Sequence, residues 1–451
     1  MMKERAKYLK QIIFLCLGAM CLCGCQLTPA KQIFKEAPSC VLSEAQIQVV
    51  ENDNTFMSDE WPDQEWWLFF EDPQLTELIR QTLSRHPSMR LAEAHFLIAN
   101  ATREKMGAPL FPTMDFEADR THLHNSVNGI FGILHAADPS YPLTYSQNNI
   151  MLNMAYEFDI WKKHANQVVA AIDEMRALEA EAYISQLGLS LSVAQSYFQQ
   201  QAARSRQTIA ELLLKNRQTM YRLTEQQYSQ GVGNTWSINR AKEAELTSRE
   251  YMDKVVLDVA LTNNDLQALL AGDFNTIIDS VDWSNNLAKP FPIPCSLPLD
   301  LLAHRPDIWA QRWRVEAAVR QVYAAKAGFY PNINMIGLLG LQALTFNPLF
   351  SHDSIFGLLY GPAIHLPVFD GGVIRAEFDT KNQEYYAAIA QYETLVLTAV
   401  KEVLNALVAV QATAEASRLV QGRQALAREN LEIAQQYYDK QLISLTDFFS
   451  L

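Results

Sequence analysis

Two histidines separated by one residue are the simplest candidates for metal chemistry in this 451-residue chain. In an extended strand His122 and His124 share one face, and two adjacent imidazoles can bind a divalent cation. Histidines beside a loop are more often solvated, so we expect no metal there. The chain has no Walker loop, no glycine-rich dinucleotide fingerprint, no Gly-x-Ser-x-Gly elbow and no His-Glu-x-x-His motif. The sequence therefore predicts no enzyme, no metal site and no cofactor.

The cysteine that closes the N-terminal segment is a candidate for covalent modification. Four basic residues within the first ten are followed by the apolar stretch Ile12–Leu22, about half the ~20 residues of a membrane-spanning helix. The stretch ends in Leu22-Cys23-Gly24-Cys25, which resembles a bacterial lipobox. We therefore predict a lipoprotein signal peptide over 1–24, with a palmitate-type acyl group on Cys25. The alternative is a plain secretory signal with a stray cysteine. Gln26, where inner-membrane lipoproteins usually carry Asp, favours the outer membrane.

Composition and charge exclude several classes. The chain is 49% hydrophobic and only 19% charged, with a net charge of −13. Because the predicted signal peptide is basic, the remainder is more acidic still, which argues against nucleic-acid binding. Cys40 and Cys295 are the only other cysteines beyond residue 25, and two distant cysteines form no disulfide framework. After residue 24 no run of ~18 apolar residues occurs, so we expect no transmembrane helix and any membrane crossing must use a β-barrel.

An internal repeat is the most informative feature. Pro87 pairs with Pro306, and Pro112 with Pro331, at one offset of 219. Downstream, 156–165 matches 367–376 at an offset of 211, and 226–231 matches 436–441 at an offset of 210. In each copy a proline opens a helix, an aromatic-Pro pair ends it, and alternating segments follow. Chance similarity between alanine-rich helices does not account for ordered anchors at nearly constant offsets.

Each repeat predicts two strands and one very long helix. Apolar and polar residues alternate near 113–122 and 148–159 in the first repeat, and more weakly near 332–342 and 355–369 in the second. Pro362 predicts an interruption or bulge in the last of these strands. The segments 160–230 and 371–440 read as helices, each with a single glycine after its first few residues. Seventy helical residues extend roughly 105 Å, so such helices need neighbouring helices to bury their apolar sides.

Several segments resemble the TolC family of outer-membrane efflux proteins, in its lipoprotein (NodT/RND-type outer membrane factor) branch. Residues 66–79 look like the opening helix of that family, and 293–308 resemble its inter-repeat signature, which ends in Arg-Pro-Asp. Pro367–Gly372 resembles its strand-to-helix junction. The resemblance implies a mainly α fold with a transmembrane β-barrel part. The duplicated strand-strand-long-helix unit would form a trimeric α-barrel plus a 12-stranded β-barrel, with four strands per protomer.

The same resemblance divides the chain. An N-terminal lipid-anchored segment would cover 25–60, the first TolC-like repeat 61–272, a linker 273–300 and the second repeat 301–451. The first repeat continues for 31 residues past the point that matches Leu451. We therefore expect the second repeat to be truncated at its C-terminus; the alternative is a protein that lacks its final return helix.

The resemblance also implies two sites at the periplasmic end. The helix turns would dock a periplasmic adaptor through Gly231, Val232, Gly233, Asn234 and Thr235 in the first repeat and Gln441, Leu442, Ile443 and Ser444 in the second. Gln441 stands where the first turn has Gly231, which leaves the geometry of the second turn open. A periplasmic gate would use Glu429 and Glu432, which share a helix face, with Arg222 holding the neighbouring helices closed. The alternatives are a plain interhelical turn and a solvated acidic face.

Three functions compete for this pattern. The first is a passive outer-membrane channel subunit of a tripartite efflux or export system, handling small molecules such as drugs and toxic compounds. Its partners would be a homotrimer, a periplasmic adaptor (membrane fusion) protein, an inner-membrane pump and outer-membrane lipid, and it would have a large periplasmic part. The second is a lipid-anchored coiled-coil spacer, which has no use for amphipathic strands. The third is an envelope enzyme, against which the missing catalytic motifs count.

Overall fold

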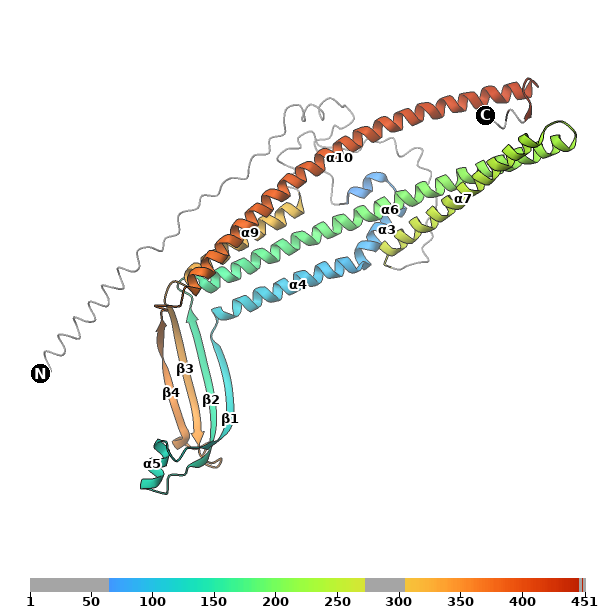
Figure 1. The fold of residues 1–451 in the computed structure, drawn as a ribbon. Helices are drawn as coiled ribbons and strands as arrows, with labels where there is room; N and C mark the ends of the chain where they lie inside the picture. Colours follow the sequence, from blue (N-terminus) through green and yellow to red (C-terminus); the bar gives the residue numbers. More distant parts are fainter. Residues whose placement is uncertain (1–64, 272–304, 446–447, 449–451) are drawn as a thin grey trace, which may run out of the picture. The chain divides into compact units, whose positions relative to one another are not determined.

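The computed structural model describes residues 65–271, 305–445 and 448. The predicted signal peptide, Cys25, the 25–60 segment and the 273–300 linker lie outside these residues. Among the described residues the chain is mainly helical, with one four-stranded sheet (Figure 1). The prediction of a mainly α chain with a β part is thereby confirmed.

Helices dominate the described part of both repeats. The first repeat contains the short 3-10 helix η2 (Trp66–Phe70), the helices α3 (Pro73–Arg85) and α4 (Pro87–Gly107), and the turn η3 (Ala108–Leu110). It continues with α5 (Ile130–Ala137), α6 (Lys163–Ser229) and α7 (Thr235–Leu269). The second contains α9 (Pro306–Ala327), η4 (His352–Ser354) and α10 (Val373–Asp439). Pro87 and Pro306 each occupy the first helical position, where a missing N–H costs nothing.

The four strands form an antiparallel meander in the order β1-β2-β3-β4. They cover β1 (Thr113–His124), β2 (Thr144–Phe158), β3 (Asn332–Ala343) and β4 (Ile355–His365). Pro362 pairs in register with Met335; the irregularity lies a few residues away, between Leu338 and Gly340. The register shift expected from Pro362 is therefore present in β4, but not at the proline.

A buried cluster joins the start of the first repeat to α6 and α7. It contains Trp67, Leu75, Leu78 and Ile79 from the N-terminal side, Val193, Ala194 and Tyr197 from α6, and Leu266 and Leu270 from the end of α7. Inside it the Tyr197 hydroxyl donates to Asp72 Oδ2 at 2.6 Å, while Asp72 Oδ1 accepts from the amides of Gln74 and Leu75. Burial, then the Asp72 carboxylate, raises the pKa of Tyr197, so the phenol keeps its proton.

Alanines allow α9 to pack closely along α6. Ala177 and Ala180 of α6 and Ala310 of α9 are buried together, with Trp313 against them. The Arg176 guanidinium lies 4.6 Å from the Trp313 ring centroid, a cation–π contact that covers the edge of this seam. Small residues at a helix interface shorten the interaxial distance, which fixes the second repeat on the first.

The far part of α10 has few neighbours. One 18-residue stretch of α10 is strongly apolar, yet only 11% of that stretch is buried. By length and composition alone such a helix could cross a membrane, which no uninterrupted apolar run in the sequence suggested.

Candidate functional site

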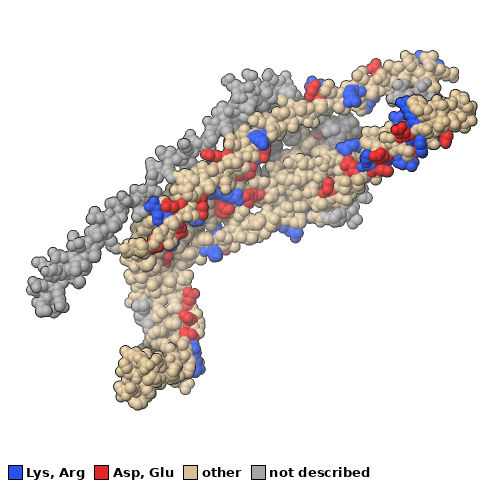
Figure 2. Space-filling view, viewed as in Figure 1, with Lys and Arg blue, Asp and Glu red and all other residues tan. Residues whose placement is uncertain are grey.

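The two faces of the sheet differ in polarity. Phe116, Leu152 and Leu339 are register neighbours on one face. On the opposite face Asn149 donates to Asp119 at 3.0 Å and accepts from Gln342 at 3.2 Å, which links three strands through polar side chains. Figure 2 shows few charged side chains on the visible face of the sheet and acidic ones along one edge. A sheet with one apolar and one polar face suits a wall between lipid and water.

Matching aspartates start the long helix of each repeat. Asp159 accepts hydrogen bonds from the amides of His164 (3.0 Å) and Ala165 (2.7 Å). Asp370 accepts from those of Gly372 (2.9 Å) and Ile374 (2.7 Å). Each carboxylate satisfies amides that the first helical turn leaves without intrahelical partners. The backbone hydrogen bonds from Ile374 and Gly372 lower the pKa of Asp370.

The sequence difference between these two junctions has a structural reason. Trp161 stands where the second repeat has Gly372, and its indole Nε1 donates to the carbonyl of Pro331 at 2.9 Å. The Trp161 ring also stacks on Tyr330, with centroids 4.6 Å apart. Trp161 of the first repeat therefore holds the aromatic-Pro pair that ends α9 of the second. The sequence carries one signal for this role, a tryptophan where the other repeat has glycine.

The Arg-Pro-Asp signature ties α9 to α10. The Arg305 guanidinium forms a bidentate pair with Asp307, at 3.0 and 2.7 Å, and reaches Glu402 of α10 at 2.8 Å. Hydrogen bonding to Asp307 raises the pKa of Arg305. Burial alone would raise the pKa of Asp307, but the Arg305 hydrogen bond and charge outweigh it, so that pKa is lowered. The signature thus positions α9 against α10.

The predicted docking turns have the same backbone geometry. In the first, the amide of Gly231 donates to Tyr228 O (2.9 Å) and that of Val232 to Gln227 O (2.9 Å). In the second, Gln441 donates to Tyr438 O (2.8 Å) and Leu442 to Tyr437 O (2.9 Å). Both are Schellman caps. Gln441 adopts a φ of 60°, close to the 80° of Gly231, so the glutamine keeps the turn at the cost of a left-handed conformation.

The remaining predicted docking residues lie on or beside these turns. Gly233 has a φ of 142°, and Asn234 caps α7 by accepting from the Ser237 amide at 2.9 Å. Thr235 is the first residue of α7. In the second turn Leu442 is 67% exposed, Ile443 is partly exposed and Ser444 is exposed. The exposed residues offer a surface at the end of each helix.

The structure does not bring the three predicted gate residues together within one chain. Glu429 and Glu432 lie exposed near the end of α10, and Arg222 lies exposed near the end of α6. None of the three forms an ion pair with any residue in the described part of the chain. Helical spacing puts both glutamates on one face of α10, but it carries no information on the rotation of α10 relative to α6.

Within the described residues there is no group of three His, Cys, Asp or Glu side chains that could hold a metal. His122 and His124 instead contact hydroxyls of the neighbouring strand, Ser146 at 3.1 Å and Thr144 at 2.6 Å.

A duplicated unit of two strands and a very long helix, joined in one sheet with a polar and an apolar face, defines a channel-forming protein of the outer membrane. Residues 78–272 and 297–448 match the model of the outer membrane efflux protein family, and the chain belongs to this family. The sequence is 30% identical over 370 residues to the multidrug resistance outer membrane protein MdtQ of Escherichia coli O6:H1, covering 80% of this chain and 76% of that one.

Two further proteins support the assignment. The cation efflux system protein CusC of Escherichia coli O6:H1 is 26% identical over 390 residues, covering 86% of this chain and 80% of its own. The crystal structure of the outer membrane protein VceC from Vibrio cholerae is similar with a TM-score of 0.72 and 29% identity, covering 86% of this chain and 92% of that chain. The protein is therefore an outer-membrane channel subunit of a tripartite efflux system and not an enzyme.

Proposed function

We propose that three copies of this chain close one channel, a 12-stranded β-barrel continued by an α-barrel. The observation that carries the proposal is the sheet: among the described residues, β1 and β4 each pair on one side only. An open sheet edge leaves backbone N–H and C=O groups without partners, which hydrocarbon does not tolerate. Four strands are too few to close a barrel alone, whereas β1 of one copy can pair with β4 of the next.

The exposed apolar side of α10 supports the same assembly. Large apolar side chains along it, including Val408, Leu419, Leu426 and Leu431, are between 55% and 63% exposed in the single chain. Burying a leucine side chain stabilises by about 1.5–3 kcal/mol, so a helix this long gains much from helical neighbours. In a trimer those neighbours are the helices of adjacent copies.

We infer a lipid anchor at Cys25, with the helices in the periplasm. The inference rests on the lipobox alone, because Cys25 lies outside the described residues. Cys25→Ser should abolish labelling by radioactive palmitate and block cleavage at residue 24, while trimers still form because barrel closure holds them. Unchanged labelling of the variant would exclude acylation at this position.

The Schellman turns are proposed as the adaptor-docking surface. The exposed Val232 and Leu442 occupy the same position in the two turns, so the trimer would present six similar tips. Gly233→Trp should abolish export while the amount of trimer stays normal. Normal export by the Gly233→Trp variant would remove the docking role.

The gate proposal concerns the same end of the molecule. Threefold symmetry would bring six carboxylates of Glu429 and Glu432 toward one axis, where their charge favours cations. Replacing both with Gln should reduce cation selectivity in planar bilayers, and Arg222→Ser should raise resting conductance. A double Gln variant with wild-type selectivity would place these residues outside the constriction.

The proposed cargo is small molecules, drugs and other toxic compounds, passed on by the inner-membrane pump and the adaptor. The relatives named for multidrug resistance and for cation efflux support this class of cargo. Expression with its own pump and adaptor in a strain that lacks outer-membrane efflux channels should restore drug resistance. Resistance that does not differ from that of the empty strain would contradict the proposed cargo.

A further inference from the structure

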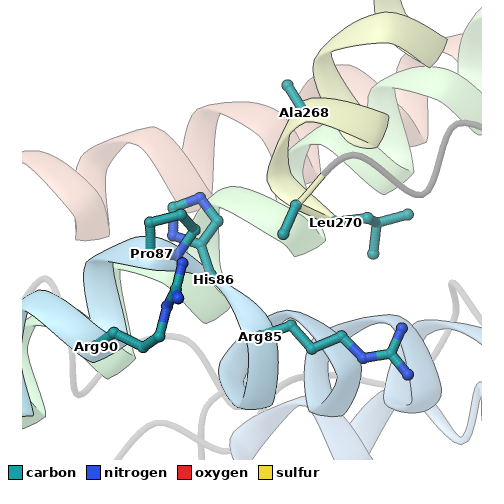
Figure 3. A pocket seen from close by; sticks show the side chains of 7 residues that line it. Arg85, His86, Pro87, Arg90, Ala268 and Leu270 are labelled. Atoms are coloured by element: carbon teal, nitrogen blue, oxygen red, sulfur yellow. The ribbon is translucent and has the colours of Figure 1, made fainter.

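A cavity of about 550 Å³ lies where α3 ends, α4 begins and α7 ends (Figure 3). Its lining consists of Arg85, His86, Pro87, Arg90, Ala268, Leu270 and Ala271. The volume falls within the ~300–1,000 Å³ of ordinary small-ligand sites. The described part of the lining contains two guanidinium groups and an imidazole, and no carboxylate.

The two arginines lack partners within the described residues. The other arginines of α3 and α4 are paired, Arg80 with Glu65 and Arg103 with Glu104. Neither Arg85 nor Arg90 forms an ion pair with any residue of 65–271 or 305–445. Two unpaired cations beside one cavity are notable in a chain with a net charge of −13.

His86 adds a hydrogen-bond donor beside the two arginines. The His86–Pro87 step separates α3 from α4, so Arg85 closes one helix and Arg90 lies in the first turns of the next. His86 Nδ1 accepts from the Ser88 amide at 3.2 Å, which leaves Nε2–H as a donor in the neutral ring. Figure 3 shows Arg90 beside Pro87 and His86, whereas Arg85 extends on the other side, below Leu270.

We propose that this pocket binds carboxylate groups of peptidoglycan, the cell-wall polymer. A guanidinium presents parallel N–H donors that match an oxyanion, and carboxylate and phosphate both fit. The location favours the carboxylate. From Arg90 to the end of α4 at Gly107 the helix rises about 26 Å, so the pocket lies well away from the sheet and from lipid headgroup phosphates. Peptidoglycan is the fixed polymer of the periplasm that carries free carboxyl groups. This placement rests on the proposed membrane-spanning sheet.

Co-sedimentation of the purified, detergent-solubilised protein with insoluble peptidoglycan sacculi tests the proposal. The wild type should sediment with native sacculi and at least tenfold less with sacculi whose carboxyl groups have been amidated. Arg85→Gln/Arg90→Gln should reduce binding to native sacculi by about tenfold or more, because each charge-assisted hydrogen bond is lost. Arg423→Gln/Arg428→Gln, which removes two exposed arginines of α10, is the matched control and should bind as the wild type does.

Four results would overturn the proposal: full binding by the Arg85/Arg90 variant, equal binding to amidated sacculi, an equal loss in the control variant, or no binding by the wild type. Vesicles containing phosphatidylglycerol provide a further arm. Binding to those vesicles that requires Arg85 and Arg90, in place of binding to sacculi, would assign the pocket to lipid phosphate and also overturn it. The SDS-resistant trimer is measured in each sample, and its absence would contradict the proposed assembly rather than the ligand.

Discussion

Exchanging the residues that close the two helix turns tests how far one turn geometry serves both repeats. Gly231 has a φ of 80° and Gln441 a φ of 60°. A Cβ added at Gly231 would meet no heavy atom within 4 Å, so Gly231→Gln changes only the backbone energy. A side chain in the left-handed region costs about 1 kcal/mol relative to glycine. We therefore expect Gly231→Gln to destabilise the first turn by that amount and Gln441→Gly to stabilise the second by a similar amount.

Hydrogen exchange reads both effects at defined amides. The amides of residues 231, 232, 441 and 442 each donate to a carbonyl of the preceding helix, so their protection reports turn opening. A change of about 1 kcal/mol corresponds to roughly a fivefold change in protection factor, lower in Gly231→Gln and higher in Gln441→Gly. Val232→Ala is the control, with protection unchanged. Protection that is unaffected by Gln441→Gly would refute the claim that the glutamine is strained.

Two further perturbations concern the helix starts. Tyr197→Phe removes a buried hydrogen bond to the Asp72 carboxylate, so it should destabilise the helical part by about 1.5–3 kcal/mol. Circular dichroism should then show a lower thermal midpoint of unfolding. An unchanged midpoint would contradict this. The pKa of Asp370 is lowered, so its contribution is complete above its ordinary value of 3.8 and is lost as the pH falls through the lower folded value. Hydrogen-exchange protection of the Gly372 and Ile374 amides should therefore decline only in acid. Asp370→Asn, which lacks a titrating carboxyl, should abolish that decline. An identical acid decline in the variant would show that the Asp370 carboxylate is not its cause.

Period-2 alternation located the strands because each strand has one apolar and one polar face. The first strand was expected near 113–122 and covers Thr113–His124. The second begins at Thr144, before the expected 148, because Thr144–Gln147 carry polar residues on both faces and show no alternation. The fourth ends at His365 rather than near 369, since Leu366–Phe369 continue the apolar character without a strand partner.

Contacts between distant residues could not be predicted from periodicity. Tyr197 and Asp72 lie 125 residues apart, and neither shows a motif. The helix α5, within the β1–β2 connection, was not expected, because eight residues are too few for a helical period to emerge from an apolar stretch. For the gate, helical spacing puts Glu429 and Glu432 on one face of α10. Whether that face lines the pore or the outside of the assembly depends on how neighbouring copies pack.

Disulfide scanning across the sheet edges tests the central claim of a closed trimer most directly. Cysteines are introduced in pairs, one at Phe116 of β1 and one at Tyr360 or Ile364 of β4, all exposed in the single chain. Oxidation of outer membranes should yield a ladder of one, two and three protomers that stops at three, because β1 of each copy meets β4 of the next around a closed ring. A ladder that continues beyond three protomers, or the absence of any crosslink between the two edges in every pair, would contradict the account.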